Sequence, residues 1–114
     1  MFNIKRPEKI TLKVSVRIPG EREAHKFTGH FAYLDMRERK EFVDRLAYKD
    51  SSLDDMEVVK DLLIGWEDLK QANGDPLEFN EANVEKLMNI PYARAAVMKV
   101  VMSDILSGGF VVKN

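Results

Sequence analysis

The sequence predicts an α+β fold in which an N-terminal antiparallel β-hairpin packs on three to four α-helices. Between residues 10 and 33, two stretches alternate apolar and polar side chains with a period of two, which is typical of strands covered on one face. Between residues 35 and 106, apolar side chains instead recur every three or four positions, as they do on amphipathic helices. The length of 114 residues suits one domain, which we expect to span residues 1–114.

Composition and charge exclude several classes of function. Hydrophobic residues make up 45% of the chain and charged residues 32%, as in an ordinary soluble globular protein. The net charge of −1 leaves no basic excess to neutralise phosphates, so we predict no nucleic-acid partner. No apolar stretch approaches the roughly twenty residues that cross a bilayer, so we predict no membrane association. The absence of cysteine excludes disulfides, thiolate metal sites and thiol nucleophiles.

The predicted hairpin consists of "ITLKVSVRI" at residues 10–18 and "AHKFTGHFAY" at residues 24–33, joined by the turn "PGERE". His25 shares the apolar face of the second strand and is expected to be half-buried, whereas His30 lies on the polar face and is expected to be solvated. Because an isolated hairpin is only marginally stable, its apolar face must lie on helices or on the sheet of another chain.

Two helices are predicted after the hairpin. Asp35 and a glutamate three residues later form a capping box that opens a helix ending near Tyr48. Ser52 starts a second helix, in which apolar residues continue at helical spacing as far as Trp66. Gly65 lies near the end of this run, where a glycine disfavours further helix and predicts a stop or a bend. We expect Trp66 to seal the helix end against the core, with a partner anchor as the alternative role.

A turn and two further helices complete the predicted domain. The turn is "ANGDP", and Asn80 is placed to cap a helix over "EANVEKLMN". Pro91 suits the first turn of a last helix, "PYARAAVMKVVMSDIL", which "SGG" ends, leaving residues 107–114 as a flexible tail. We predict structural roles for the residues that shape this corner, which are Gly65, Trp66, Gly74, Phe79, Asn80 and Pro91.

No constellation of residues predicts catalysis or metal binding. A calcium loop with Gly74 at its sixth place would have Leu69 at its first, where a carboxylate is required. His25 and His30 point to opposite faces of a strand and cannot bind one ion together. The carboxylates of the second helix are typical of a solvated face, and no glycine-rich phosphate loop occurs. We therefore predict no enzyme, no cofactor and no metal.

The last helix is apolar over more of its circumference than one core seam requires. Three residues at helical spacing fill that seam, which leaves Met98, Val100 and Met102 without an obvious place. Two interpretations follow: the helix is central and fully buried, or one side of it contacts another chain. Methionine suits the second interpretation, because its flexible side chain adapts to varied apolar partners.

The corner and the last two helices follow a recognisable order. An apolar helix ends near a tryptophan with a neighbouring glycine, an Asn-Gly turn leads through an apolar residue into a capped helix with Leu-Met, and a proline and an aromatic residue begin the last helix. In this order the chain resembles the tail assembly chaperones of long-tailed bacteriophages over about residues 56–106. The matching positions are Gly65, Trp66, Asn73, Gly74, Phe79, Asn80, Leu87, Met88, Pro91 and Tyr92.

The resemblance implies a chaperone without catalytic residues. Proteins of this family bind the long apolar tape measure protein in the host bacterial cytoplasm, recruit the tail tube protein, and are absent from the mature virion. We expect self-association through the open edge of the hairpin, and the residues expected to grip the tape measure protein are Tyr92, Met98, Val100 and Met102. The alternative is a structural minor tail component or adaptor protein. Genes of this family often end in a programmed frameshift, and residues 108–114 permit slippery codons.

Overall fold

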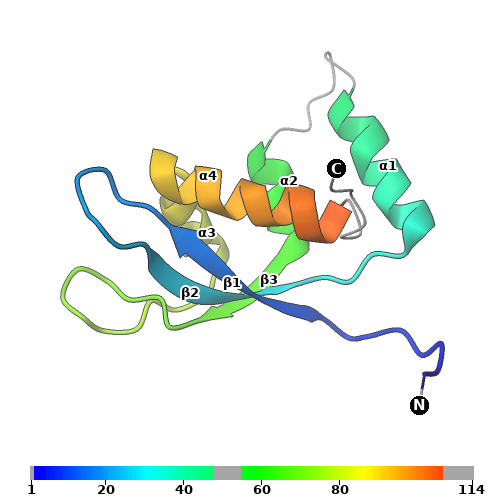
Figure 1. The fold of residues 1–114 in the computed structure, drawn as a ribbon, viewed down its shortest axis with the longest axis horizontal. Coiled ribbons are helices and arrows are strands. Elements are labelled where there is room, and N and C mark those ends of the chain that lie inside the picture. Colours follow the sequence, from blue (N-terminus) through cyan, green and yellow to red (C-terminus); the bar gives the residue numbers. More distant parts are fainter. Residues whose placement is uncertain (1, 48–54, 107–114) are drawn as a thin grey trace.

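The computed structural model of the protein describes residues 2–47 and 55–106. These residues form a three-stranded sheet and four α-helices, the last of which continues into a π-helical segment (Figure 1). The elements follow one another as β1 (Ile10–Val16), β2 (His25–Phe31), α1 (Met36–Ala47), α2 (Asp55–Leu62), β3 (Leu63–Glu67), α3 (Glu81–Met88), α4 (Pro91–Val100) and η1 (Val101–Leu106). The expected α+β class and the N-terminal hairpin are confirmed. The predicted helix boundaries at Tyr48 and Ser52 and the predicted tail lie outside the described residues.

The helices α2, α3 and α4 lie on one side of the sheet, and α1 stands beside the end of α4 (Figure 1). α4 makes its main sheet contacts with β1, and α1 packs mainly on η1. The apolar face of the hairpin therefore lies on helices of its own chain, one of the two arrangements expected. The largest side chains buried between the layers include Val14, Phe27, Phe31, Val59, Leu62, Trp66, Met88, Val97 and Ile105.

The pairing of β1 with β2 fixes which side chains face the helices. The two strands are antiparallel, from Ile10 opposite Phe31 to Val16 opposite His25. Val14 and Val16 are buried, whereas the residue between them is exposed. Successive side chains of a strand point to opposite faces, so the predicted period of two is confirmed for β1.

The sequence-based prediction of a helix through Trp66 is wrong. α2 ends at Leu62, and Leu63–Glu67 forms β3, which pairs antiparallel with β2 through a bulge that leaves Ile64 unpaired. The apolar residues of this run fit helical spacing, but a short apolar run fits a buried strand equally well. The free edge of β2 decides between the two structures, because pairing with β3 satisfies its backbone hydrogen-bonding groups.

Trp66 lies in the core, with only 8% of its surface exposed. Its indole Nε1 donates a hydrogen bond to the carbonyl oxygen of Leu77 at 2.7 Å. Its ring makes edge-on contacts with Phe79 and Phe27, with centroids 4.9 and 6.5 Å away. Trp66 and Phe79 thus tie the loop after β3 to the sheet. At the turn of that loop, Gly74 has a φ of 90°, a left-handed conformation that favours glycine.

Side chains cap two of the helices at their predicted starts. Asp35 Oδ1 accepts a hydrogen bond from the backbone N–H of Glu38 at 2.9 Å, and Glu38 Oε1 accepts one from that of Asp35 at 3.0 Å, so the predicted capping box opens α1. Asn80 Oδ1 accepts from the backbone N–H of Asn83 at 2.8 Å and opens α3. Pro91 occupies the first turn of α4, where its missing N–H has no cost.

The Asn80 cap makes a testable contribution to stability. We expect Asn80→Ala to lower the free energy of unfolding by about 1 kcal/mol, the typical cost of losing an N-cap. Asn80 is exposed, so the change removes the hydrogen bond without opening a cavity. Urea titration followed by circular dichroism measures the difference. Asn80→Ser should recover most of the loss, because a serine hydroxyl accepts the same bond. An equal loss in the serine variant would contradict the capping role.

Candidate partner-binding site

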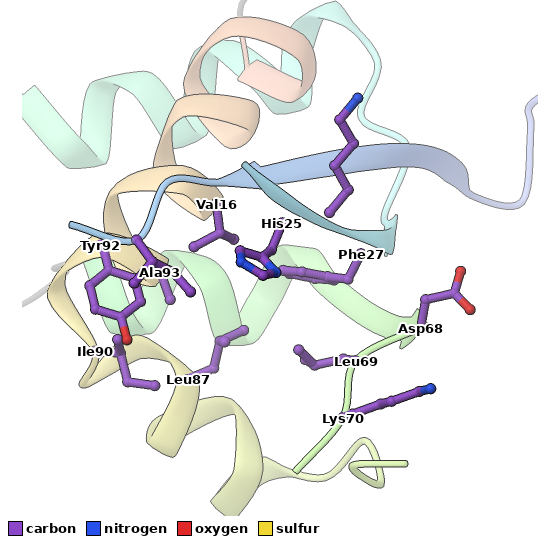
Figure 2. A pocket seen from close by; sticks show the side chains of 12 residues that line it. Val16, His25, Phe27, Asp68, Leu69, Lys70, Leu87, Ile90, Tyr92 and Ala93 are labelled. Carbon is purple, nitrogen blue, oxygen red and sulfur yellow. The ribbon is translucent and has the colours of Figure 1, made fainter. Parts of the chain in front are cut away.

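A groove opens where the end of the hairpin, the segment after β3 and the start of α4 meet (Figure 2). We call it the hairpin groove, and its volume is about 390 Å³. This size lies near the low end for ligand pockets, about 300–1,000 Å³, and suits a few side chains of a partner. The apolar part of its lining consists of Val16, Ile18, Phe27, Leu69, Leu87, Ile90, Tyr92 and Ala93.

The bend between α3 and α4 builds one wall of the hairpin groove. A proline disfavours helical backbone in the residue before it, and Ile90, which precedes Pro91, is extended with φ −92° and ψ 112°. The bend places Ile90 and Tyr92 at the groove, where they remain 38% and 37% exposed. Arg94 Nε braces the bend by donating to the carbonyl oxygen of Met88 at 2.8 Å. Pro91 therefore shapes the groove although its own side chain does not line it.

Charged residues form the rim of the hairpin groove. Lys26, Asp68 and Lys70 line it, and Figure 2 shows Asp68 and Lys70 directed away from its apolar side chains. His25 also lies there, with Nε2 at 2.5 Å from Glu21 Oε1. Two lysines and one aspartate line the groove, and Glu21 beside His25 adds a second carboxylate. The two lysine ammonium groups can pair with acidic residues that flank the apolar surface of a partner.

The structure brings only one of the four predicted partner contacts to the hairpin groove. Tyr92 lines the groove, whereas Met102 is 47% exposed in η1 and Met98 is half-buried against the core. Val100 is 8% exposed and belongs to the core of this chain, which differs from the exposed position that its predicted contact with a partner implies. The physical reason is the position of α4, which packs on β1 with Val100 at the junction of the two elements. The side of α4 that carries Val100 is therefore buried within this chain.

A polar cluster occupies the outer face of the sheet. His30 Nδ1 lies 3.0 Å from Thr11 Oγ1, and His30 Nε2 lies 2.6 Å from Glu67 Oε2. The His30 side chain is 12% exposed and that of His25 is 59% exposed, so the predicted burial of the two histidines is reversed. The pairing of β2 with β3 explains why His30 is covered. Gly65 lies opposite His30 in β3, and the imidazole packs against this strand, where a Cβ on Gly65 would lie at an ordinary contact distance of 3.4 Å from His30 Cδ2.

The cluster of Thr11, His30 and Glu67 joins all three strands. Both ring nitrogens of His30 contact these neighbours, which helps to hold the three strands in register. The sequence predicts Thr11 and His30 only as polar-face residues of the two hairpin strands, the register of β1 and β2 places them opposite each other, and the pairing of β3 with β2 brings Glu67 beside them. Among the described residues, no group of three or more His, Cys, Asp or Glu side chains could hold a metal ion.

The chain matches no protein-family model, no characterised protein and no solved structure. Within residues 2–47 and 55–106, no helix has the length and apolar character needed to cross a membrane. The hairpin groove and the sequence resemblance are therefore the grounds on which a function can be proposed.

Proposed function

We propose that this protein is a tail assembly chaperone of a long-tailed phage or prophage. It binds and solubilises the tape measure protein in the host bacterial cytoplasm and helps recruit the tail tube protein. The resemblance over residues 56–106 supports this proposal, because the residues that carry it form one connected unit. This unit contains β3 with Trp66, the loop that Trp66 closes, and the helices α3 and α4. It departs from the expected pattern in one respect, since Gly65 and Trp66 lie in a strand that follows the helix.

The hairpin groove is the observation that carries the proposal. An amphipathic helix presents apolar side chains three and four residues apart, and such a stripe fits an apolar groove. Tyr92 combines a large apolar ring with a polar tip, which is typical of residues that anchor interfaces. The bound stretch of the tape measure protein should carry aspartate or glutamate beside its apolar stripe, where Lys26 and Lys70 can pair with them.

Co-expression with a tape measure protein tests the proposal. The wild-type chaperone should keep the tape measure protein in the soluble fraction, and Tyr92→Asp should abolish this effect. The substitution places a carboxylate against apolar lining that the partner must cover, and covering an unpaired charge is costly. Tyr92 is already 37% exposed, so the variant should remain folded, which circular dichroism can check.

Met102→Asp is the matched control, because Met102 is 47% exposed in η1 and does not line the groove. It should preserve solubility of the tape measure protein. Loss of solubility with Met102→Asp alone would contradict the hairpin groove as the binding site. Mass spectrometry of purified virions separates the two candidate roles. A chaperone should be absent from the particle, and its presence would favour a structural minor tail component.

A further inference from the structure

Residues 2–9 precede β1 as a segment without helix or strand, in which the backbone N–H of Lys5 donates to Asn3 Oδ1 at 2.9 Å, and we call this segment the arm. Every residue of the arm is exposed, and two large apolar side chains, Phe2 and Ile4, are 86% and 91% exposed. They alternate with Asn3 and Lys5, which is the period of a strand that covers an apolar surface with one face. Figure 1 shows the arm running away from the sheet and the helices.

Arg6 anchors the base of the arm to the start of α1. Its Nη2 donates to the carbonyl oxygen of Tyr33 and to Glu38 Oε1, both at 2.9 Å, and its Nη1 lies 3.8 Å from Asp35 Oδ2. The guanidinium also lies over the Tyr33 ring, 5.3 Å from its centroid. The anchor holds the arm in one direction, so that Phe2 and Ile4 project beyond the fold in a position to meet another molecule.

The β3 edge of the sheet is suited to receive such a segment. The strand order β1-β2-β3 leaves β3 with one edge that no strand pairs in the described residues, and edge strands readily add a further strand. Ile64 in this strand is 46% exposed. A cavity of about 400 Å³ lies beside it, lined by Leu63, Ile64, Phe79 and Val84 with Lys60 and Glu81. We call this surface the β3 edge.

The charges of the arm and of the β3 edge are complementary. Apart from Arg6, which pairs with carboxylates of its own copy, the arm carries Lys5 and Lys9 against a single acidic residue. At the β3 edge, Lys60 Nζ bonds Glu85 at 2.6 Å and lies 3.2 Å from Glu81, so the group retains one excess negative charge. The hydrogen bond to Glu85, and to a smaller extent that to Glu81, also raises the pKa of Lys60 above its ordinary value. An arriving basic segment therefore meets a partly acidic surface.

We propose that the arm of one copy binds along the β3 edge of a second copy, with Phe2 and Ile4 over the cavity beside Ile64. Backbone pairing with β3 supplies the general affinity, and the two apolar side chains supply the specificity. Each copy has one arm and one β3 edge, which lie on different parts of its surface. Two copies can exchange their arms reciprocally in a closed dimer, and a contact that is not reciprocated builds rings or open chains of copies. This self-association goes beyond the proposed function, because it requires neither the tape measure protein nor the hairpin groove.

Cysteine cross-linking tests the contact cleanly, because the chain has no cysteine of its own. A chain with Ile4→Cys is mixed with a chain carrying Ile64→Cys under mild oxidation, and the proposal predicts a disulfide-linked heterodimer. The control pair combines Ile4→Cys with Met36→Cys, since Met36 is a 62% exposed residue away from β3. The control pair should give only background cross-linking. Adding Phe2→Asp to the Ile4→Cys chain should reduce the yield to that background.

Two outcomes would overturn the proposal. One is equal cross-linking of the test and control pairs. The other is a chain with both Ile4→Cys and Ile64→Cys that closes its disulfide within single copies, which would place the arm on its own sheet. A second measurement avoids changes at β3: sedimentation of the Phe2→Asp, Ile4→Asp variant should show loss of self-association, and unchanged association would also overturn the proposal. Tyr92→Asp should leave cross-linking unchanged. The contact between copies and the binding of the tape measure protein in the hairpin groove are therefore tested independently.

Discussion

Trp66→Ala is expected to lower the free energy of unfolding by about 3–5 kcal/mol, the usual cost of truncating a large aromatic residue in a core. Three contacts disappear together: the edge-on packing against Phe79 and Phe27, and the hydrogen bond from the indole to the Leu77 carbonyl oxygen. The loop between β3 and α3 is attached to the sheet through these contacts. We therefore expect the variant to loosen this loop as well as to open a cavity.

Urea unfolding followed by circular dichroism measures this loss, because the substitution removes the only tryptophan fluorophore. Trp66→Phe should fall between wild type and Trp66→Ala, since it keeps most of the apolar volume but loses the Nε1 donor. Met36→Ala, at a site 62% exposed, should stay within about 0.5 kcal/mol of wild type. A Trp66→Ala variant as stable as Met36→Ala would show that Trp66 contributes little to the core and would reopen its role as a partner anchor.

The hairpin could be predicted from the sequence because its signals are local. In β1 the alternation is strict and most of the apolar residues are β-branched, so the period of a strand fits the sequence and the period of a helix does not. The capping residues Asp35 and Asn80 are equally local, because each bonds a backbone N–H three residues away. Such features depend on no distant part of the chain, and the structure has them where the pattern predicts them.

The third strand could not be predicted in the same way. Leu63 and Trp66 are spaced as on a helix, and both are buried in a strand as well. What decides the structure is the edge of β2, which lies more than thirty residues earlier in the chain. Because the sequence does not predict β3, the expected exposures of His25 and His30 are also reversed. His30 is covered only when β3 pairs with β2 and places Gly65 opposite it.

Only part of the lining of the hairpin groove could be predicted from the sequence. The resemblance indicates Tyr92 as a partner contact, whereas Ile18 and Leu69 join Tyr92 at the groove only through the fold. Val100 and Met102 lie two positions apart and therefore on different faces of an apolar helix, but their own neighbourhood does not show which face is buried. The packing of α4 on the sheet decides it, since Val100 is 8% exposed and Met102 is 47% exposed.

The two glycines of the sheet should respond to alanine with opposite signs. Gly29 is buried beneath the Phe31 ring, and an added Cβ would lie 2.8 Å from Phe31 Cε1 and 3.4 Å from Val14 Cγ2. Both neighbours are fully buried and cannot move aside. We therefore expect Gly29→Ala to lower the free energy of unfolding by about 1–3 kcal/mol, the usual cost of overpacking a core.

Gly65→Ala is the matched control in the neighbouring strand. Its Cβ would lie 3.4 Å or more from the nearest atoms, those of His30, and the backbone there does not have the positive φ that favours glycine. Alanine should then raise the free energy of unfolding by about 0.4–1 kcal/mol, because it restricts the unfolded chain without straining the folded one. The same urea titration measures both variants. If Gly65→Ala lowered the free energy of unfolding as much as Gly29→Ala, the β-bulge next to Gly65 would require glycine at that position even without a close side chain.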